Sequence, residues 1–107
     1  MGLKYTENIE INDKSSQIYV CKNCKTHLLK SDWIESYDFR GIHGDAFYSN
    51  KLINYLINKN IKIKEMMTGY YQVKSINCYQ CLLEIGWKYI KANDPSQKYK
   101  ENKFVIE

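Results

Sequence analysis

The 107-residue sequence contains a single proline, no low-complexity block and no apolar run close to the roughly 18 residues of a membrane span. The chain has 44% hydrophobic residues, 26% charged residues and little proline, a composition that excludes a disordered chain. The first residues also lack the apolar segment of a secretory signal peptide. We therefore expect one globular domain of an intracellular protein that does not enter a membrane.

The four cysteines form two CxxC pairs, Cys21 with Cys24 and Cys78 with Cys81. In a reducing compartment such pairs indicate metal or redox chemistry rather than disulfides. A CxxC turn points two thiolates at one centre, and two such turns complete a tetrahedron around Zn²⁺. The 53 residues between Cys24 and Cys78 exceed the loop of a small zinc finger. The spacing thus predicts one structural zinc that clamps two distant parts of a single domain.

Several other interpretations of these residues stay open. Iron can bind the same four thiolates, and one CxxC alone can form a thioredoxin-like redox pair, although that leaves the second pair unexplained. His27, three residues after Cys24, would complete a Cys₃His site only by leaving one cysteine unused. His43 lies between two glycines, without the serine and aspartate of a catalytic triad. Because no fifth cysteine remains as a nucleophile, we do not expect an enzyme.

Short segments rich in β-branched and aromatic residues predict a mainly β domain over residues 17–107, after a flexible polar leader at residues 1–16. Tyr71, Val73 and Ser75 alternate with Tyr70, Gln72, Lys74 and Ile76, a period of two that fits a half-buried strand. Gly41, Gly44, Gly69 and Gly86 predict turns, positive φ or close backbone approaches. The strands are expected in QIYV, DAFYS, LINYLI, IKIKEMM, YYQVKSIN, LLEIGWKYI and KFVIE, although LINYLI also fits helical spacing.

The formal charge of +4 raises the question of nucleic acid binding. Four thiolates and one Zn²⁺ together contribute −2, which lowers the charge of the metal-bound chain to +2. The lysines are also dispersed, in IKIKE, WKYIK and QKYKENK, among apolar or acidic residues. We interpret them as the solvated faces of strands and do not expect nucleic acid as a partner.

Five segments between about Tyr19 and Glu107 occur together in a recognisable order and spacing: CKNCKTHL, FRGIHGDAFYS, MMTGYYQV, NCYQCLLEIGWKYIKA and SQKYKENKFVIE. In these segments the sequence resembles the Yippee-like proteins. It departs from the family at Tyr71, where most relatives have histidine, and at Asn102, where they have glycine. A role that needs an imidazole at position 71 is therefore not carried over.

The resemblance implies a β-tent, in which two antiparallel sheets meet near one structural zinc, similar to the thalidomide-binding domain of cereblon, the Mis18 domain and methionine sulfoxide reductase B. It also implies a nuclear or cytoplasmic location. The leading Met-Gly and the polar leader are similar to the branch described as accessory subunits of the CTLH (GID) ubiquitin ligase. From this resemblance we expect a protein-binding module with a protein partner.

Trp87, six residues after Cys81, corresponds to one wall of the aromatic cage of the cereblon-type domain, and Tyr71 and Phe47 are candidates for others. Such a cage holds flat or cationic groups. The alternative for each aromatic residue is ordinary core packing. Two other functions compete with protein binding, a thiol-dependent reductase like methionine sulfoxide reductase B, which lacks a spare cysteine here, and a nucleic-acid-binding domain.

Overall fold

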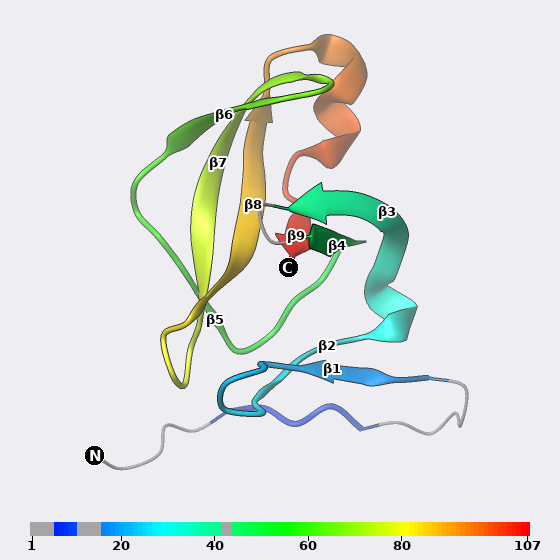
Figure 1. The fold of residues 1–107 in the computed structure, drawn as a ribbon, viewed down its shortest axis with the longest axis vertical. Helices are drawn as coiled ribbons and strands as arrows, with labels where there is room; N and C mark the ends of the chain where they lie inside the picture. Colours follow the sequence, from blue (N-terminus) through cyan, green and yellow to red (C-terminus); the bar gives the residue numbers. More distant parts are fainter. Residues whose placement is uncertain (1–5, 11–15, 42–43) are drawn as a thin grey trace.

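A computed structural model describes residues 6–10, 16–41 and 44–107. The prediction of a mainly β chain is confirmed, since the described residues form nine strands and two short 3₁₀ helices (Figure 1). No helix among them is long and apolar enough to cross a membrane. In chain order the elements are β1 Ile18–Val20, β2 His27–Lys30, η1 Ser31–Trp33, β3 Ile34–Gly41, β4 Gly44–Ser49, β5 Tyr55–Ile57, β6 Lys62–Met66, β7 Gly69–Cys78, β8 Glu84–Ala92, η2 Pro95–Lys100 and β9 Phe104–Ile106.

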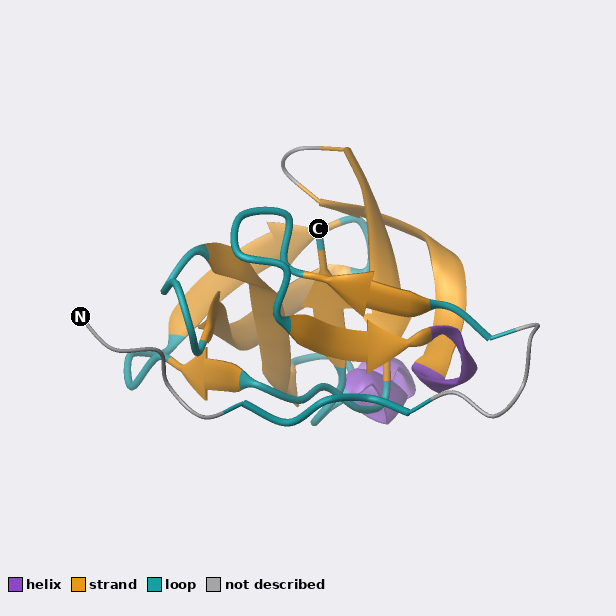
Figure 2. Cartoon of the chain, turned by 90° about the horizontal axis from the view of Figure 1, so that it is seen from below, coloured by secondary structure: helices purple, strands orange, loops and turns teal. Residues whose placement is uncertain are grey.

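The strands form two antiparallel sheets, as the resemblance implied. β1 and β2 make a two-stranded sheet, and the other strands make a seven-stranded sheet of order β3-β4-β9-β8-β7-β5, with β6 also paired to β7. β5 pairs with the C-terminal end of β7, and β6 pairs with its N-terminal half. The β1–β2 ribbon lies across the end of the large sheet where β7 turns into β8 (Figures 1 and 2).

The β7–β8 hairpin is the longest paired unit, and its alternation follows the prediction as far as Ser75. Tyr71, Val73 and Ser75 are buried and the residues between them are partly or fully exposed, but Ile76, expected on the opposite face, is also buried because it packs in the core between the sheets. Gly86, in β8, packs so tightly against β9 that a Cβ atom there would lie 1.9 Å from the Val105 carbonyl oxygen. The close backbone approach expected at this glycine is thus present.

Two clusters of buried side chains make up the core. The first joins both sheets and includes the buried cysteines, Leu28 and Leu29 of β2, and Ile76 and Ile85 of the large sheet. The second lies within the large sheet and contains Ala46, Tyr48, Tyr71, Val73, Trp87, Tyr89, Ala92 and Val105. The first cluster therefore carries the apolar contact between the two sheets.

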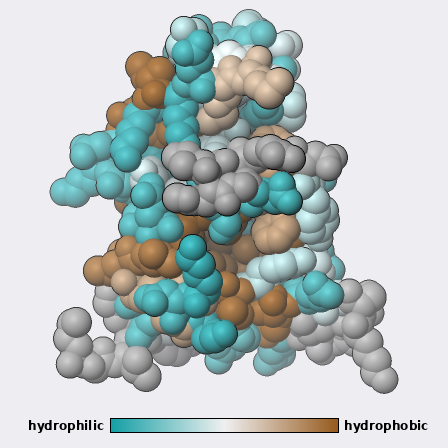
Figure 3. Space-filling model, in the orientation of Figure 1, coloured by the Kyte–Doolittle hydropathy of each residue, from teal (hydrophilic) through white to brown (hydrophobic). Residues whose placement is uncertain are grey.

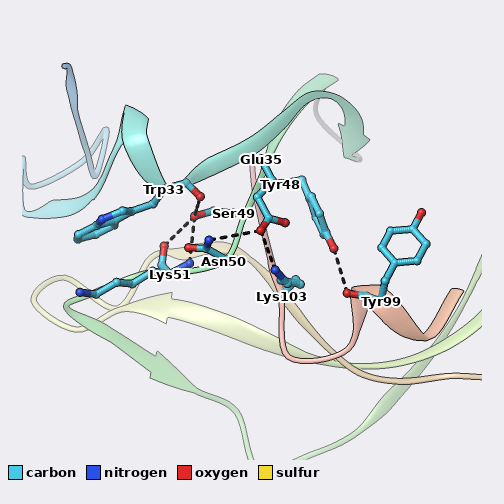
Figure 4. Close-up of polar contacts among 8 residues, drawn as sticks. All are labelled: Trp33, Glu35, Tyr48, Ser49, Asn50, Lys51, Tyr99 and Lys103. Carbon is cyan, nitrogen blue, oxygen red and sulfur yellow. Dashed lines mark hydrogen bonds and ion pairs between the residues drawn. The ribbon is translucent and has the colours of Figure 1, made fainter. Parts of the chain in front are cut away.

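Hydrogen bonds also fasten η1 and β3 to the neighbouring strands (Figure 4). The buried Ser49 hydroxyl of β4 is 2.9 Å from the carbonyl oxygen of Trp33 and 2.8 Å from that of Lys51. Lys103, just before β9, forms a 2.7 Å ion pair with Glu35 of β3. These contacts hold the outer strands of the sheet in register.

Three strand predictions differ from the structure. The segment LINYLI was expected to be a strand throughout, but only Tyr55–Ile57 is extended, because Asn54 has a φ of 55° that interrupts it. β2 and β3 were not predicted. Gly69 has the expected positive φ, at 124°. Gly41 pairs with Gly44 at the ends of β3 and β4, and the turn between them, with His43, lies outside the described residues.

Within the predicted leader, described residues 6–10 run beside the β2 end of the domain. The Glu7 backbone exchanges two hydrogen bonds with the Asn54 side chain, at 2.9 Å and 2.8 Å. The Ile9 N–H donates to His27 Nδ1 at 2.9 Å. That this leader contributes little to stability stays a prediction.

Candidate metal centre and binding cavity

The two CxxC turns have the same backbone geometry. In the first, the Cys21 N–H donates to the Thr26 carbonyl and the Lys25 N–H donates to the Cys21 carbonyl, both at 2.9 Å. The second turn repeats these bonds with Cys78, Leu83 and Leu82. The residue after each second cysteine has a positive φ, 67° at Lys25 and 68° at Leu82. Each turn is thus a knuckle that directs two sulfurs to the same side.

The four sulfurs converge on one point. All four Sγ atoms lie within 4.8 Å of one another, with 3.6 Å between those of Cys21 and Cys81 and 3.5 Å between those of Cys24 and Cys78. Zinc bound tetrahedrally by four thiolates at about 2.3 Å places the sulfurs about 3.8 Å apart. The cluster therefore fits one zinc ion, which confirms the predicted cofactor. The four cysteines predicted to bind it lie close together.

Each knuckle combines one buried and one half-buried sulfur. Burial raises the pKa of Cys78 to about 12 and also raises that of Cys21. A hydrogen bond from the Asn23 side chain lowers the pKa of Cys81 to about 6. Burial alone would raise the pKa of Cys24, but hydrogen bonds from Thr26 lower it overall. Bound zinc supplies positive charge that stabilises all four thiolates.

His27 is not brought into the cluster. His27 lies at the start of β2 and accepts the hydrogen bond from Ile9 through Nδ1, so it sits at the edge of the domain rather than on the metal. His43 lies outside the described residues. Among the described residues, the group that can hold a metal consists of cysteines only.

Beside the first knuckle is a cavity of about 660 Å³, between the β1–β2 ribbon and the inner face of the large sheet. Phe47 and Trp87 both line it, and Phe47 also packs on Tyr19 with ring centroids 4.7 Å apart. Tyr71 does not line the cavity. In Figure 3, apolar residues reach the surface in the lower half of the molecule, among polar ones. The structure therefore brings together two of the three predicted binding aromatics.

Trp87 is a wall of the cavity and also part of the core. Its side chain is 5% exposed, and its ring meets that of Tyr89 edge to face at 6.3 Å. The indole N–H has no partner in hydrogen-bond geometry among the described residues. Burial raises the pKa of the Tyr89 phenol to about 12, an effect that the nearby Trp87 indole N–H opposes.

Tyr71 has a different environment, within the core of the large sheet. It is 2% exposed, and its hydroxyl contacts Thr68 and accepts a 3.1 Å hydrogen bond from Lys100 Nζ. Lys100 is itself buried, and its ammonium lies 5.1 to 5.9 Å from the ring centroids of Phe39, Tyr71, Tyr89 and Tyr99. Tyr71 thus anchors η2 to β7 through this lysine.

The prediction for the lysines of IKIKE was wrong at Lys64. It is half-buried, whereas its neighbour Ile63 is 72% exposed, so β6 presents its lysines to the cavity and its isoleucine to solvent. Lys62 and Lys64 both line the cavity. The period of two in IKIKE showed that these lysines share a face, but it did not show which face points inward.

Comparison with known proteins agrees with this architecture. A family model described as Yippee zinc-binding/DNA-binding/Mis18, centromere assembly matches residues 17–107. A yippee-like protein of Solanum tuberosum is 44% identical over 91 residues, 85% of this chain and 70% of its own. A Schizosaccharomyces pombe yippee-like protein is 39% identical over 92 residues, 86% of this chain and 70% of its own.

Human yippee-like protein 4 is 39% identical over 89 residues, which cover 83% of this chain and 69% of the human one. None of these names is that of an enzyme. The family match covers residues 17–107, the relatives are similar over most of the chain, and the cluster of four cysteines fits the family's zinc-binding description. The chain therefore belongs to the Yippee–Mis18 family of zinc-binding domains.

Proposed function

We propose that this chain is a non-catalytic binding domain, in which the zinc centre sets the frame and the cavity takes part of a protein partner. The cavity carries the proposal, because about 660 Å³ lies within the roughly 300–1,000 Å³ typical of ligand sites. Its lining combines apolar and aromatic side chains with a few charged ones, which is also typical of such sites.

The zinc centre contributes rigidity to this site. Cys21 belongs to the first knuckle and Leu83 directly follows the second, and both residues line the cavity. A bound metal therefore holds one end of the cavity in place. The chain has four cysteines, and all four converge on the metal site, so none is left as the nucleophile of a sulfoxide reductase.

The family resemblance supplies a candidate class of partner, subunits of a CTLH-type ubiquitin ligase in the nucleus or cytoplasm. The test is co-purification of the tagged chain from its source cell, followed by mass spectrometry. Ligase subunits that elute with the wild-type chain support this partner. Recovery of nucleic acid instead, with a steep dependence on salt, would favour the nucleic-acid-binding alternative.

The site is tested with two matched substitutions of aromatic residues. Phe47→Ser changes a half-buried wall of the cavity, and Tyr70→Ser changes an aromatic side chain that is 52% exposed and lies outside it. We expect Phe47→Ser to lose the partner and Tyr70→Ser to keep it, with zinc content unchanged in both. Equal retention of the partner by both variants would place the binding surface elsewhere.

Trp87→Ala is the harsher test of the same wall. Because Trp87 is both core and cavity lining, we expect this variant to lose about 3 to 5 kcal/mol of stability as well as the partner. A variant that keeps its melting temperature and loses its partner would show that the binding role dominates. A variant that melts early yet retains the partner would assign Trp87 to the core alone.

A further inference from the structure

Lys64 is the half-buried charged residue of the cavity. It lies in β6 opposite Tyr71 of β7, on the same side of the sheet as buried Val73. The other charged residues that line the cavity, Lys22, Asp45, Lys62, Glu84 and Glu107, are exposed. Since exposed charges at a rim are screened by water and salt, the charge of Lys64 dominates inside the cavity.

The Lys64 ammonium covers the face of the cavity's tryptophan. Its Nζ atom lies 3.8 Å from the centroid of the Trp87 ring. A free cation or a flat group that needs this face would have to displace a cation of the chain itself. The arrangement therefore disfavours the cationic guest that an aromatic cage would take, and instead offers a positive group to the guest.

Among the described residues, no carboxylate neutralises this ammonium at close range. In the part of the chain that the structure describes, no carboxylate oxygen lies within the 4.0 Å of an ion pair with Lys64 Nζ. Burial lowers the pKa of Lys64, an effect that the more distant Glu107 and Glu84 oppose and that Lys62 adds to. Water only partly solvates this half-buried ammonium and no described carboxylate pairs with it, so a guest that supplies a negative group gains from pairing with it.

We propose that Lys64 sets the specificity of the cavity, which takes a carboxylate carried on an apolar body. The carboxylate pairs with the Lys64 ammonium, and the apolar body packs among Phe47, Ile85 and Ile106. This inference rests on the proposed function, because it requires the cavity to be a binding site. The carboxylate can belong to a small organic acid or to the end of a protein chain.

A purely structural role for Lys64 makes a different prediction. Inward-pointing lysines protect exposed sheet edges from pairing with other chains, and β6 pairs on one side only among the described strands. Such a role requires no preference for the charge of a ligand. Charge selectivity therefore separates the two roles, whereas loss of stability alone would not.

The experiment titrates the full-length, zinc-loaded, ¹⁵N-labelled chain with three probes that share one apolar body: 4-phenylbutyrate, 4-phenylbutan-1-ol and 4-phenylbutylamine. Amide signals of Ile85 and Gly86 and the indole signal of Trp87 report on the cavity. We expect phenylbutyrate to bind about tenfold more tightly than the alcohol, as a charge-assisted hydrogen bond provides, and the amine to bind most weakly.

Substitutions of lysine then assign this preference to one residue. Lys64→Met keeps the length of the side chain and its contact with Trp87 but removes the charge, and we expect it to abolish the preference for phenylbutyrate. Lys64→Arg keeps the charge and should retain most of the preference for phenylbutyrate. Lys59→Met is the matched control, because Lys59 is exposed and does not line the cavity.

The source of the carboxylate is tested with an acetylated tetrapeptide ending in phenylalanine, as the free acid and as the amide. Tighter binding of the peptide acid than of phenylbutyrate indicates a chain end, and the reverse indicates a small acid.

If the three phenylbutyl probes bind equally, or if Lys64→Met retains the preference, the proposed role of Lys64 is wrong while the cavity remains a binding site. If no probe shifts the cavity signals, both proposals fail. Should Lys64→Met not fold, the comparison of probes on the wild-type chain still decides.

Discussion

The two zinc knuckles share their backbone hydrogen bonds and their positive φ, but they stand on different supports. The second joins β7 and β8, strands of ten and nine residues within a seven-stranded sheet. The first joins β1 and β2, strands of three and four residues that pair only with each other among the described strands. The local geometry of a metal half-site is thus independent of the size of the sheet behind it.

This contrast has an energetic consequence. The ladder of the large sheet supports the second half-site in addition to the metal. The first is held by its two sulfurs and by the packing of Leu28 and Leu29 against the inter-sheet core. The metal should therefore matter most to the β1–β2 ribbon and to the cavity that it walls.

The largest effect is expected from loss of the metal. The purified chain should contain one Zn²⁺, and Cys→Ser at Cys21, Cys24, Cys78 or Cys81 should unfold it or make it insoluble, because structural zinc contributes about 10 kcal/mol or more. Elemental analysis and circular dichroism check this. A folded chain without metal would contradict the prediction.

While a chelator removes the metal from the wild-type chain, any asymmetry between the knuckles becomes measurable. Amide hydrogen exchange should accelerate in β1 and β2 before it does in β7 and β8, since the latter have more sheet partners to lose. Equal acceleration in both regions would show that the large sheet depends on the metal as much as the ribbon does.

A smaller loss is expected from the apolar contact between the sheets. Leu29 is fully buried in the inter-sheet cluster, so Leu29→Ala should destabilise the chain by about 2 to 5 kcal/mol in denaturant unfolding. Ile63→Ala, at a position 72% exposed, is the control and should change stability little. If both variants unfold alike, Leu29 does not secure the ribbon.

A gain in stability is expected from relief of the positive φ in the knuckles. A non-glycine residue in this conformation costs about 1 to 2 kcal/mol, and the greater freedom of glycine in the unfolded chain offsets about half of that. Lys25→Gly and Leu82→Gly should therefore each stabilise the chain by about 0.5 to 1 kcal/mol, and by similar amounts. A clear difference between the two would show that the supports alter the knuckles after all.

The smallest effect is expected from deletion of residues 1–15. Described residues 6–10 contribute hydrogen bonds to Asn54 and His27, at the ribbon side of the molecule, but Glu7 and its bonds are exposed. We expect differential scanning fluorimetry to show a melting temperature lower by only a few degrees, equivalent to less than about 1 kcal/mol. A large drop would assign the leader a structural role in the ribbon.

The features that the sequence predicted correctly are encoded locally. A CxxC pair defines a knuckle by itself, and the alternation of Tyr71, Val73 and Ser75 defines the buried face of β7. β2 and β3 were missed because HLLK is too short to show a period and β3 departs from regular pairing at two register shifts. Their extended state depends on partners distant in sequence.

The cavity could be predicted only in part for the same reason. The sequence predicted the place of Trp87 from its distance to Cys81 along the chain. Phe47 lines the same cavity because β4 and β8, which carry the two residues, both pair with β9 in the large sheet. Tyr71 was assigned to the same pocket, but the structure places it on Lys100, which is 29 residues away. The inward orientation of Lys64 follows from the register of β6 on β7, which no short stretch of sequence specifies.

The separation of the knuckles along the chain also bears on synthesis. The first pair of cysteines leaves the ribosome 53 residues before the second pair, which is roughly 3 to 10 s at ordinary elongation rates. During that interval only half of the coordination shell exists, and the strands that wall the cavity have not formed. The newly made chain therefore has to keep Cys21 and Cys24 reduced until the β7–β8 hairpin emerges, and zinc supply and thiol protection act on the same step of its folding.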